Sequence, residues 1–161
     1  SDDGTRVVAH LARANPHWSL ITPGSRALLI VAGPQAYVSP SWYAAKQEHG
    51  RVVPTWNYSS VHLTGTATVH DDPAWVRTAV TDLTERHEGS RTSPWAVSDA
   101  PEKYIAGQLK AIVGLEMSVE RVEAKAKLSQ NRSAEEQAGV IEGLRAEGGE
   151  RGAEVADAMD T

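Results

Sequence analysis

The 161-residue sequence contains no cysteine. Disulfide bonds, thiolate metal sites and cysteine nucleophiles are therefore excluded, and the composition is compatible with a reducing compartment. No apolar run approaches the roughly 18 residues that a membrane-spanning helix requires. The first residues also lack the basic and apolar segments of a signal peptide. The sequence as given therefore predicts a cytoplasmic protein without membrane contact.

Local signatures of common enzyme sites are missing as well. The sequence has no glycine-rich phosphate loop ending in Lys-Ser or Lys-Thr, no Gly-x-Gly-x-x-Gly, no His-Glu-x-x-His and no Gly-x-Ser-x-Gly. The histidines do not have a metal-ligand spacing, since His62 and His70 would lie about 26 Å apart on one continuous strand. We therefore expect no metal and assign no catalytic residue, and whether the protein is an enzyme stays open.

The sequence has fewer basic than acidic residues. The sequence has 16 Lys and Arg against 21 Asp and Glu, which gives a formal net charge of -5. Binding to a nucleic-acid backbone normally needs a dense basic face, and no basic helix follows a short turn as in a helix-turn-helix. The charge therefore argues against direct DNA binding, although a local basic patch would be compatible with it.

The hydrophobic pattern predicts strands at residues 5–11, 27–32, 61–69 and 115–128. Gly33 and Pro34 are expected to bend the chain after the second strand, and Pro40 is expected to leave the sheet because proline cannot donate to a strand ladder. Gly65 would permit a bend within a barrel. Together with the helices below, this pattern predicts an α+β fold with a small closed or split β-barrel and flanking helices.

Three segments carry helix-start signals. Asp72 can cap free amides and Pro73 suits the first helical position, a second helix opens at residues 98–101, and Ser133 begins a third with a capping box. Beyond Arg145 the sequence has too little apolar surface to offset the entropy of ordering. We therefore expect one domain over residues 1–145 and a flexible C-terminal tail over residues 146–161, either mobile or weakly helical.

Hydroxyl, amide, aromatic and cationic side chains gather in three segments, at residues 39–43, 51–58 and 127–132. A flavin mononucleotide (FMN) needs cations and hydroxyls at its phosphate, amides at its ring edge and aromatic or apolar groups on its ring face. The three segments contain all of these groups. The alternative is that the tryptophans anchor the core and the amides cap turns, and the residues alone leave both interpretations open.

Five ordered motifs, at residues 37–43, 53–58, 95–101, 112–114 and 127–132, together resemble the PaiB family. That family is described as FMN-binding negative transcriptional regulators, and its fold is similar to the pyridoxamine-phosphate-oxidase-like FMN-binding split barrel. The resemblance implies a homodimer that binds FMN near the subunit interface. The candidate FMN-binding residues are Ser39, Trp42, Thr55, Trp56, Asn57, Tyr58, His62, Lys127, Ser129, Gln130 and Asn131.

One departure from the family pattern concerns the start of the sequence. Family members usually begin with an N-terminal helix and a first pair of strands, which the sequence as given does not contain. Either that part of the chain lies outside this sequence, or the barrel is incomplete and the affinity for FMN is in doubt. Two other functions stay open beside transcriptional regulation. One is a flavin-dependent oxidoreductase that takes hydride from NADH or NADPH for a small-molecule acceptor. The other is a cofactor-free dimeric interaction domain. Only the family resemblance indicates DNA as a partner, and the acidic net charge does not support DNA binding.

Overall fold

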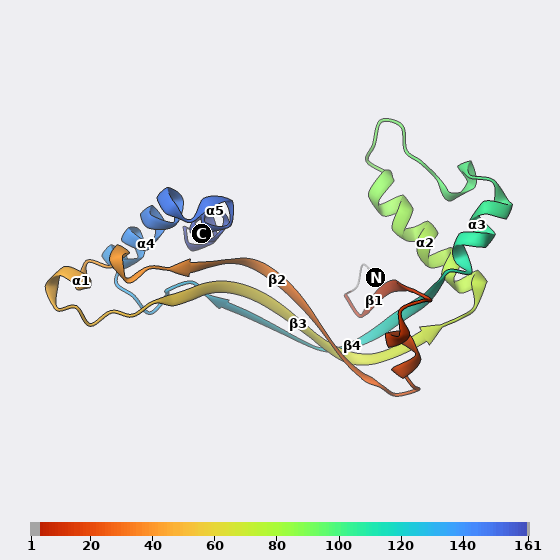
Figure 1. Cartoon of the computed structure of the whole chain (residues 1–161), viewed down its shortest axis with the longest axis horizontal. Helices are drawn as coiled ribbons and strands as arrows, with labels where there is room; N and C mark the ends of the chain where they lie inside the picture. The colour runs from red at the N-terminus through yellow and green to blue at the C-terminus, as the bar shows by residue number, and fades with distance from the viewer. Residues whose placement is uncertain (1–3, 161) are drawn as a thin grey trace. The chain divides into compact units, whose positions relative to one another are not determined.

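A computed structural model describes residues 4–160 of the chain. Its single sheet has four strands in the order β1-β4-β3-β2, and neighbouring strands of the sheet run in opposite directions (Figure 1). The strands are β1 (Arg6–Ala12), β2 (Arg26–Val38), β3 (Thr55–His70) and β4 (Ile112–Lys127). In the β1–β4 pair, Arg6 lies opposite Ser118 and Ala12 lies opposite Ile112. The expected strands are thus present, and β3 lies in the interior of the sheet between β4 and β2.

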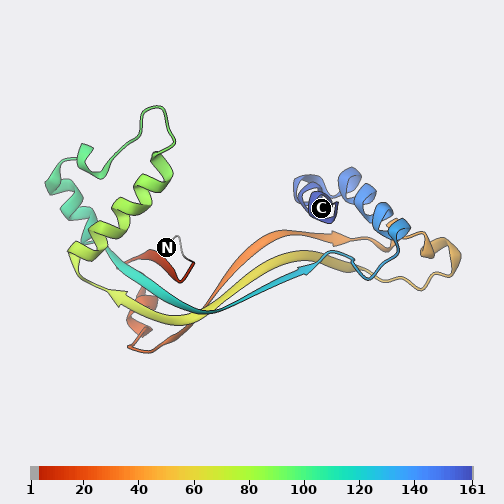
Figure 2. The same ribbon diagram turned by 180° about the vertical axis from the view of Figure 1, so that it is seen from behind.

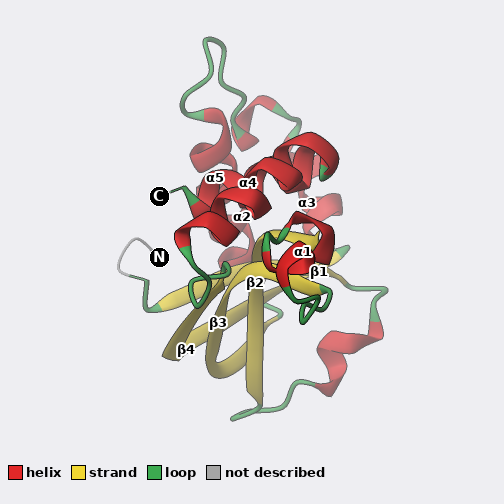
Figure 3. Cartoon of the chain, turned by 90° about the vertical axis from the view of Figure 1, so that its left-hand side faces the viewer, coloured by secondary structure: helices red, strands yellow, loops and turns green. Residues whose placement is uncertain are grey.

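The contacts divide the chain into two compact units. Unit 1 contains the residues up to Leu28 together with Leu63–Arg121, and unit 2 contains Leu29–His62 together with the residues from Val122 onward. The long strands β2, β3 and β4, which lie side by side in the sheet (Figure 3), each contribute to both units. The candidate site residues all fall within unit 2.

Unit 1 contains α2 (Pro73–Glu88), α3 (Glu102–Leu109) and two short 3-10 helices, η1 (Pro16–Leu20) and η3 (Val97–Asp99). The Asp72 carboxylate accepts hydrogen bonds from the amides of Ala74 and Trp75, which confirms the predicted start of α2. The Trp75 ring stacks on His70 with centroids 3.9 Å apart. One buried cluster of this unit consists of Val76, Val97, Ile105 and Leu109.

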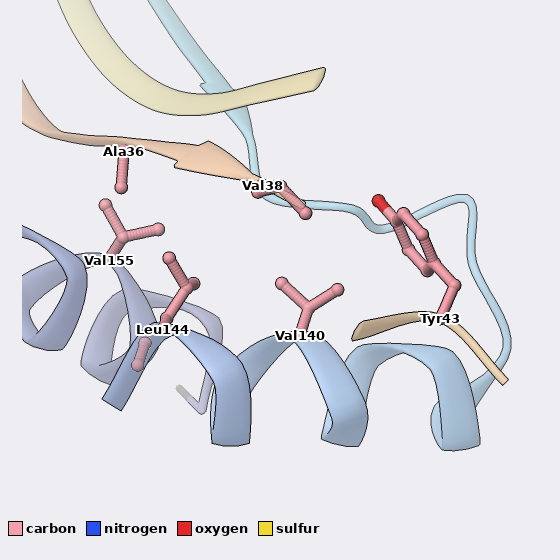
Figure 4. Packing of buried hydrophobic residues seen from close by; sticks show 7 residues of the cluster. Ala36, Val38, Tyr43, Val140, Leu144 and Val155 are labelled. Atoms are coloured by element: carbon pink, nitrogen blue, oxygen red, sulfur yellow. The ribbon is translucent and has the colours of Figure 1, made fainter. Parts of the chain in front are cut away.

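Unit 2 contains η2 (Pro40–Trp42), α1 (Ala45–Glu48), α4 (Ala134–Glu147) and α5 (Gly149–Met159). Helices α4 and α5 lie beside the C-terminal half of β2 in both views (Figures 1 and 2). Ala36 and Val38 of β2 face Leu144 of α4 and Val155 of α5 across the core (Figure 4). The predicted start of α4 is confirmed, since Ser133 Oγ accepts a hydrogen bond from the Glu136 amide at 3.2 Å.

The flexible tail predicted for residues 146–161 is wrong for Gly149–Met159, which form helix α5. Val155 and Ala156 are fully buried in the core of unit 2. Arg145 adds ion pairs to Asp157 at 3.1 Å and Asp160 at 2.8 Å. A few apolar side chains in helical spacing are therefore enough to form an ordered helix here, because they pack against α4. Thr161 lies outside the described residues.

The predicted bend at Gly33 and Pro34 is also wrong, because β2 continues through both residues to Val38. Strand β2 lies at the edge of the sheet, where a proline removes no hydrogen bond from the ladder. The departure of the chain at Pro40 is confirmed, since Pro40–Trp42 form η2. Gly65 allows close strand contact, because a Cβ there would lie 1.9 Å from the backbone oxygen of Ser118. Among the described residues, no helix is long and apolar enough to cross a membrane.

Candidate functional site

The predicted site residues come from three places in unit 2: the corner between β2 and η2, the first half of β3, and the turn after β4. An open cavity of about 470 Å³ lies between the β2–η2 corner, Trp56 of β3 and the junction of α4 and α5. Its size falls in the range of about 300–1,000 Å³ that holds small-molecule ligands and cofactors. Its walls are formed by Gln35, Ala36, Tyr37, Ser39, Trp42, Trp56, Glu147, Gly148 and Arg151.

Two exposed aromatic rings form one wall of this cavity. Tyr37 of β2 and Trp56 of β3 lie edge to face, with ring centroids 6.3 Å apart and planes at 65°. Tyr37 is 46% exposed and Trp56 is 47% exposed, so both rings present large apolar area to solvent. A planar aromatic ligand would cover this area by stacking on one ring and meeting the other near its edge.

Trp42 contributes a buried hydrogen-bond donor. Its indole packs on Gly143 of α4, where a Cβ would lie 2.3 Å from the ring. The indole Nε1 is buried and has no hydrogen-bond partner among the described residues. A buried donor without an acceptor costs about 1–3 kcal/mol. Trp42 therefore lines the cavity with apolar ring surface, while its Nε1 is shielded by protein atoms. The aromatic rings, the Ser39 hydroxyl and the Arg151 guanidinium of the lining fit FMN.

The lining also carries one cation and one anion, Arg151 of α5 and Glu147 at the end of α4. Neither side chain has a hydrogen bond or ion pair within residues 4–160. Arg145, two residues before Glu147, is by contrast paired with two carboxylates, and those pairs raise the pKa of its guanidinium, chiefly through the hydrogen bond to Asp160. Arg151 is thus the free cation of the cavity.

Lys127 is engaged by protein groups. Its ammonium donates a hydrogen bond to Thr55 Oγ1 and another, of 2.8 Å, to the backbone oxygen of Trp56. These contacts tie the end of β4 to the start of β3. Lys127 and Thr55 therefore hold the backbone that carries the Trp56 ring, and neither residue lines the cavity.

Asn57 and Ser129 form a buried polar pair. Asn57 Nδ2 donates to Ser129 Oγ at 3.0 Å and also lies 3.4 Å from Met159 Sδ of α5. Ser129 has a φ of 63°, a left-handed conformation that is uncommon for residues other than glycine. Gln130 fixes the same turn, since its Oε1 accepts from the Leu128 amide at 2.8 Å. This is the turn-capping role that the alternative interpretation gave to the amides.

Tyr58, His62 and Asn131 also lie outside the cavity lining. Tyr58 lies beside Lys125, whose Nζ is 5.9 Å from the ring centroid. His62 is half-buried further along β3, and Asn131 is exposed in the turn after β4. Of the predicted set, the structure thus brings Ser39, Trp42 and Trp56 to one cavity.

Sequence reasoning missed Tyr37 and Arg151 as individual candidates. Tyr37 alternates with the buried Ala36 and Val38, so period-2 patterning would have placed its ring on the opposite side of β2. Arg151 lies in the segment interpreted as a tail, although the spacing of Val155, Ala156 and Met159 is helical. Among the described residues, no group of three or more His, Asp or Glu side chains could hold a metal ion.

A family model described as "Putative FMN-binding domain" matches residues 1–121. The chain is 33% identical over 159 residues to the Protease synthase and sporulation protein PAI 2 of Bacillus subtilis, covering 99% of this chain and 74% of that protein. It is 40% identical over 145 residues to an uncharacterized protein of Aspergillus fumigatus, covering 80% of this chain and 56% of that relative.

Among solved structures, the FAD and heme binding protein from Mycobacterium smegmatis matches with a TM-score of 0.54 at 21% identity, covering 84% of this chain and 60% of that chain. The chain thus spans less than two thirds of this structure and of the Aspergillus relative. The likeness confirms the predicted α+β split-barrel fold. The family match includes Ser39, Trp42 and Trp56 and ends before Lys127. The chain belongs to the PaiB-like family that this FMN-binding domain model describes.

Proposed function

We propose that the chain binds FMN in the cavity of unit 2 and acts as a PaiB-type negative regulator of transcription. One observation carries the flavin assignment: the exposed rings of Tyr37 and Trp56 line one cavity of suitable size together with Ser39 and Arg151. A planar ring system with acceptors at its edge complements this combination. The family match to an FMN-binding domain supports the same ligand.

Each lining residue has a role that its chemistry suits. The ring system stacks on Trp56 and meets Tyr37 near its edge, and the Trp42 ring adds apolar surface. Ser39 Oγ accepts a hydrogen bond from the Ser41 amide at 3.2 Å, which leaves its own proton free to donate to the ligand. FMN, when bound, supplies one- and two-electron redox chemistry.

Other predicted residues act through the backbone around the cavity. Lys127 and Thr55 hold the Trp56 backbone, and Asn57 with Ser129 fixes β3 against the turn after β4. Gln130 closes that turn. We assign them positioning roles for Trp56. Tyr58, His62 and Asn131 lie outside the cavity lining, so we leave them out of the proposed FMN contacts.

A homodimer is part of the proposal, and edge strand β2 supports it. Leu28, Leu29, Ile30 and Val31 follow one another on this strand with exposures of 55%, 37%, 55% and 50%. Such an apolar run on an unpaired strand edge favours association, because monomeric proteins normally blunt their sheet edges. A second copy of the chain would cover this run.

The regulatory role is supported by the Bacillus relative, whose name connects that protein with protease synthesis and sporulation. The net charge of -5 disfavours direct contact with a DNA backbone. We therefore place regulation in a flavin-dependent interaction with another protein. A gel-shift titration with promoter DNA at physiological salt is expected to show no specific complex.

Flavin binding is tested by titrating FMN into the protein and following flavin fluorescence, visible absorbance after desalting, and melting temperature. The wild type is expected to keep a flavin band and to melt higher with FMN. Trp56→Ala is expected to weaken binding by about tenfold or more, because stacking on an aromatic side chain contributes about 1–3 kcal/mol. Trp95→Ala is the matched control, since Trp95 of unit 1 is 46% exposed and lies outside the cavity. A wild type that takes up no FMN would leave the cofactor-free interaction domain as the better account.

A further inference from the structure

The charged groups of the cavity come from a part of the chain that the family description does not cover. Arg151 and Glu147 are the charged residues of the lining, and the family match ends at residue 121. A phosphate monoester carries a charge of about -1.5 to -2 at pH 7 and has several strong acceptor oxygens. The cavity therefore needs a cation if its ligand carries such a group.

Arg151 is the cation that is available for this purpose. Lys127 donates to Thr55 and to the Trp56 backbone. Arg132 lies 4.7 Å from the centroid of the Tyr43 ring. Arg145 is held by carboxylates of α5. Arg151 has no hydrogen-bond or ion-pair partner within residues 4–160, so its guanidinium is free to bind a ligand.

The backbone of Arg151 is held in place by the packing of α5. Val155, one turn further along the helix, and Ala156 are fully buried. At the end of α5, Met159 Sδ lies 3.4 Å from the buried Asn57 amide nitrogen. The rim that presents Arg151 is therefore preorganised, and little ordering of the backbone is needed when a ligand binds.

We infer that Arg151 binds the phosphate of FMN and makes the cavity selective for FMN over riboflavin. A guanidinium suits this task because it presents several N–H donors in a fixed plane and stays charged at all working pH values. The inference rests on the proposed FMN binding, since selectivity for the phosphate presupposes a bound flavin. It adds a specificity-determining residue and gives helix α5 a direct part in the site.

Glu147 is expected to weaken FMN binding, whereas Arg151 strengthens it. Its carboxylate lines the same cavity and repels a phosphate there. Neutralising Glu147 is therefore expected to tighten FMN binding and to leave riboflavin binding nearly unchanged. Opposite effects of two neighbouring charge substitutions are a sharper signature of phosphate recognition than the loss of binding alone.

The experiment measures dissociation constants for FMN and riboflavin by quenching of flavin fluorescence at fixed ionic strength. We compare the wild type with Arg151→Gln, Glu147→Gln and the control Arg51→Gln, which removes the same charge from an exposed residue of unit 2 outside the cavity. Arg151→Gln is expected to weaken FMN on the order of tenfold to a hundredfold, as for a lost charge-assisted hydrogen bond. Riboflavin is expected to change less than about twofold by the same reasoning.

Arg151→Lys keeps the charge and is expected to retain most of the preference for FMN, and the melting temperature of each free variant reports whether α5 stays folded. The inference is overturned if the wild type binds FMN and riboflavin equally well, or if Arg151→Gln and Arg51→Gln reduce FMN binding to the same extent. In both cases FMN binding itself stands. A wild type that binds neither flavin overturns the proposed function.

Discussion

Asn57 and Ser129, which are 72 positions apart in the chain, exchange two hydrogen bonds in the interior of unit 2. Asn57 Nδ2 donates to Ser129 Oγ at 3.0 Å, and Ser129 Oγ donates to Asn57 Oδ1 at 3.2 Å. Both side chains are buried. The pair joins β3 to the turn after β4, and it therefore holds together the two segments that frame the Trp56 backbone.

Asn57→Ala is expected to lower the free energy of unfolding by about 1–3 kcal/mol, because it leaves the buried Ser129 hydroxyl without its partner. Urea denaturation measures the change. Asn131→Ala, at an exposed position of the same region, is expected to stay within about 0.5 kcal/mol of the wild type. In the double variant with Ser129→Ala the loss should be smaller than the sum of the single losses. A fully stable Asn57→Ala protein would contradict this role.

Two glycine-to-alanine substitutions are expected to affect the stability of the protein differently. A Cβ at Gly65 would lie 1.9 Å from the Ser118 backbone oxygen, whereas a Cβ at Gly107 of α3 would meet no atom within 4 Å. Gly65→Ala should destabilise the protein by about 1–3 kcal/mol or more through overpacking. Gly107→Ala should be neutral or stabilise it by up to about 1 kcal/mol, because alanine favours a helix interior. Thermal or urea unfolding of both variants checks the contrast.

Helix α5 is expected to contribute directly to stability. Val155 is 0% exposed, whereas Val53 in the same unit is 66% exposed. Val155→Ala should cost about 2 kcal/mol through lost burial and a residual cavity, and Val53→Ala should cost less than about 0.5 kcal/mol. Hydrogen exchange supplies a second readout. If the amides of α5 in the wild type exchanged as fast as those of an unfolded peptide, the prediction of a flexible tail would be correct after all.

The Arg13–Asp71 ion pair is expected to make stability pH-dependent. The side-chain hydrogen bonds from Arg13 hold the pKa of Asp71 below its ordinary value. A carboxyl group with a lowered folded-state pKa stabilises the fold above its unfolded pKa, and this stabilisation is lost as the pH falls through the folded pKa. The advantage of the wild type over Asp71→Asn should therefore be present at pH 6 and shrink below about pH 4.

Melting curves across this pH range measure the difference between wild type and Asp71→Asn. Because both side chains are exposed, 1 M salt should reduce that difference. A difference that stays the same at low pH would show that the ion pair is not its source.

Local signals in the sequence predicted much of the fold. Asp72 and Ser133 start helices where their capping chemistry placed them, and the hydrophobic pattern located a strand at residues 61–69 within β3. The bend at Pro34 was predicted wrongly, because β2 is an edge strand and a proline is tolerated in such a strand. The position of β2 in the sheet depends on the strand order, which is a property of the whole chain. Helix α5 was missed because its few apolar residues gain burial only against Leu144 and the rest of α4.

The site was predictable as a region but not as a set of contacts. Residue type indicated that Trp56 and Lys127 belonged to one polar and aromatic cluster, and the structure places both at the ends of β3 and β4. Whether a donor is free for a ligand depends on the register of the two strands. That register directs Lys127 to Thr55 and buries Asn57, while Arg151 reaches the cavity from a segment that had no assigned structure.

The central claim is that FMN occupies the cavity of unit 2, and the five tryptophans of the chain allow a direct test. Trp42 and Trp56 line the cavity, whereas Trp18, Trp75 and Trp95 belong to unit 1. The measurement is the indole N–H signals in a ¹H–¹⁵N NMR spectrum during an FMN titration, assigned with single Trp→Phe variants. The account expects the signals of Trp42 and Trp56 to shift or broaden while the other three keep their positions. Shifts confined to Trp18, Trp75 or Trp95, with Trp42 and Trp56 unchanged, would contradict it.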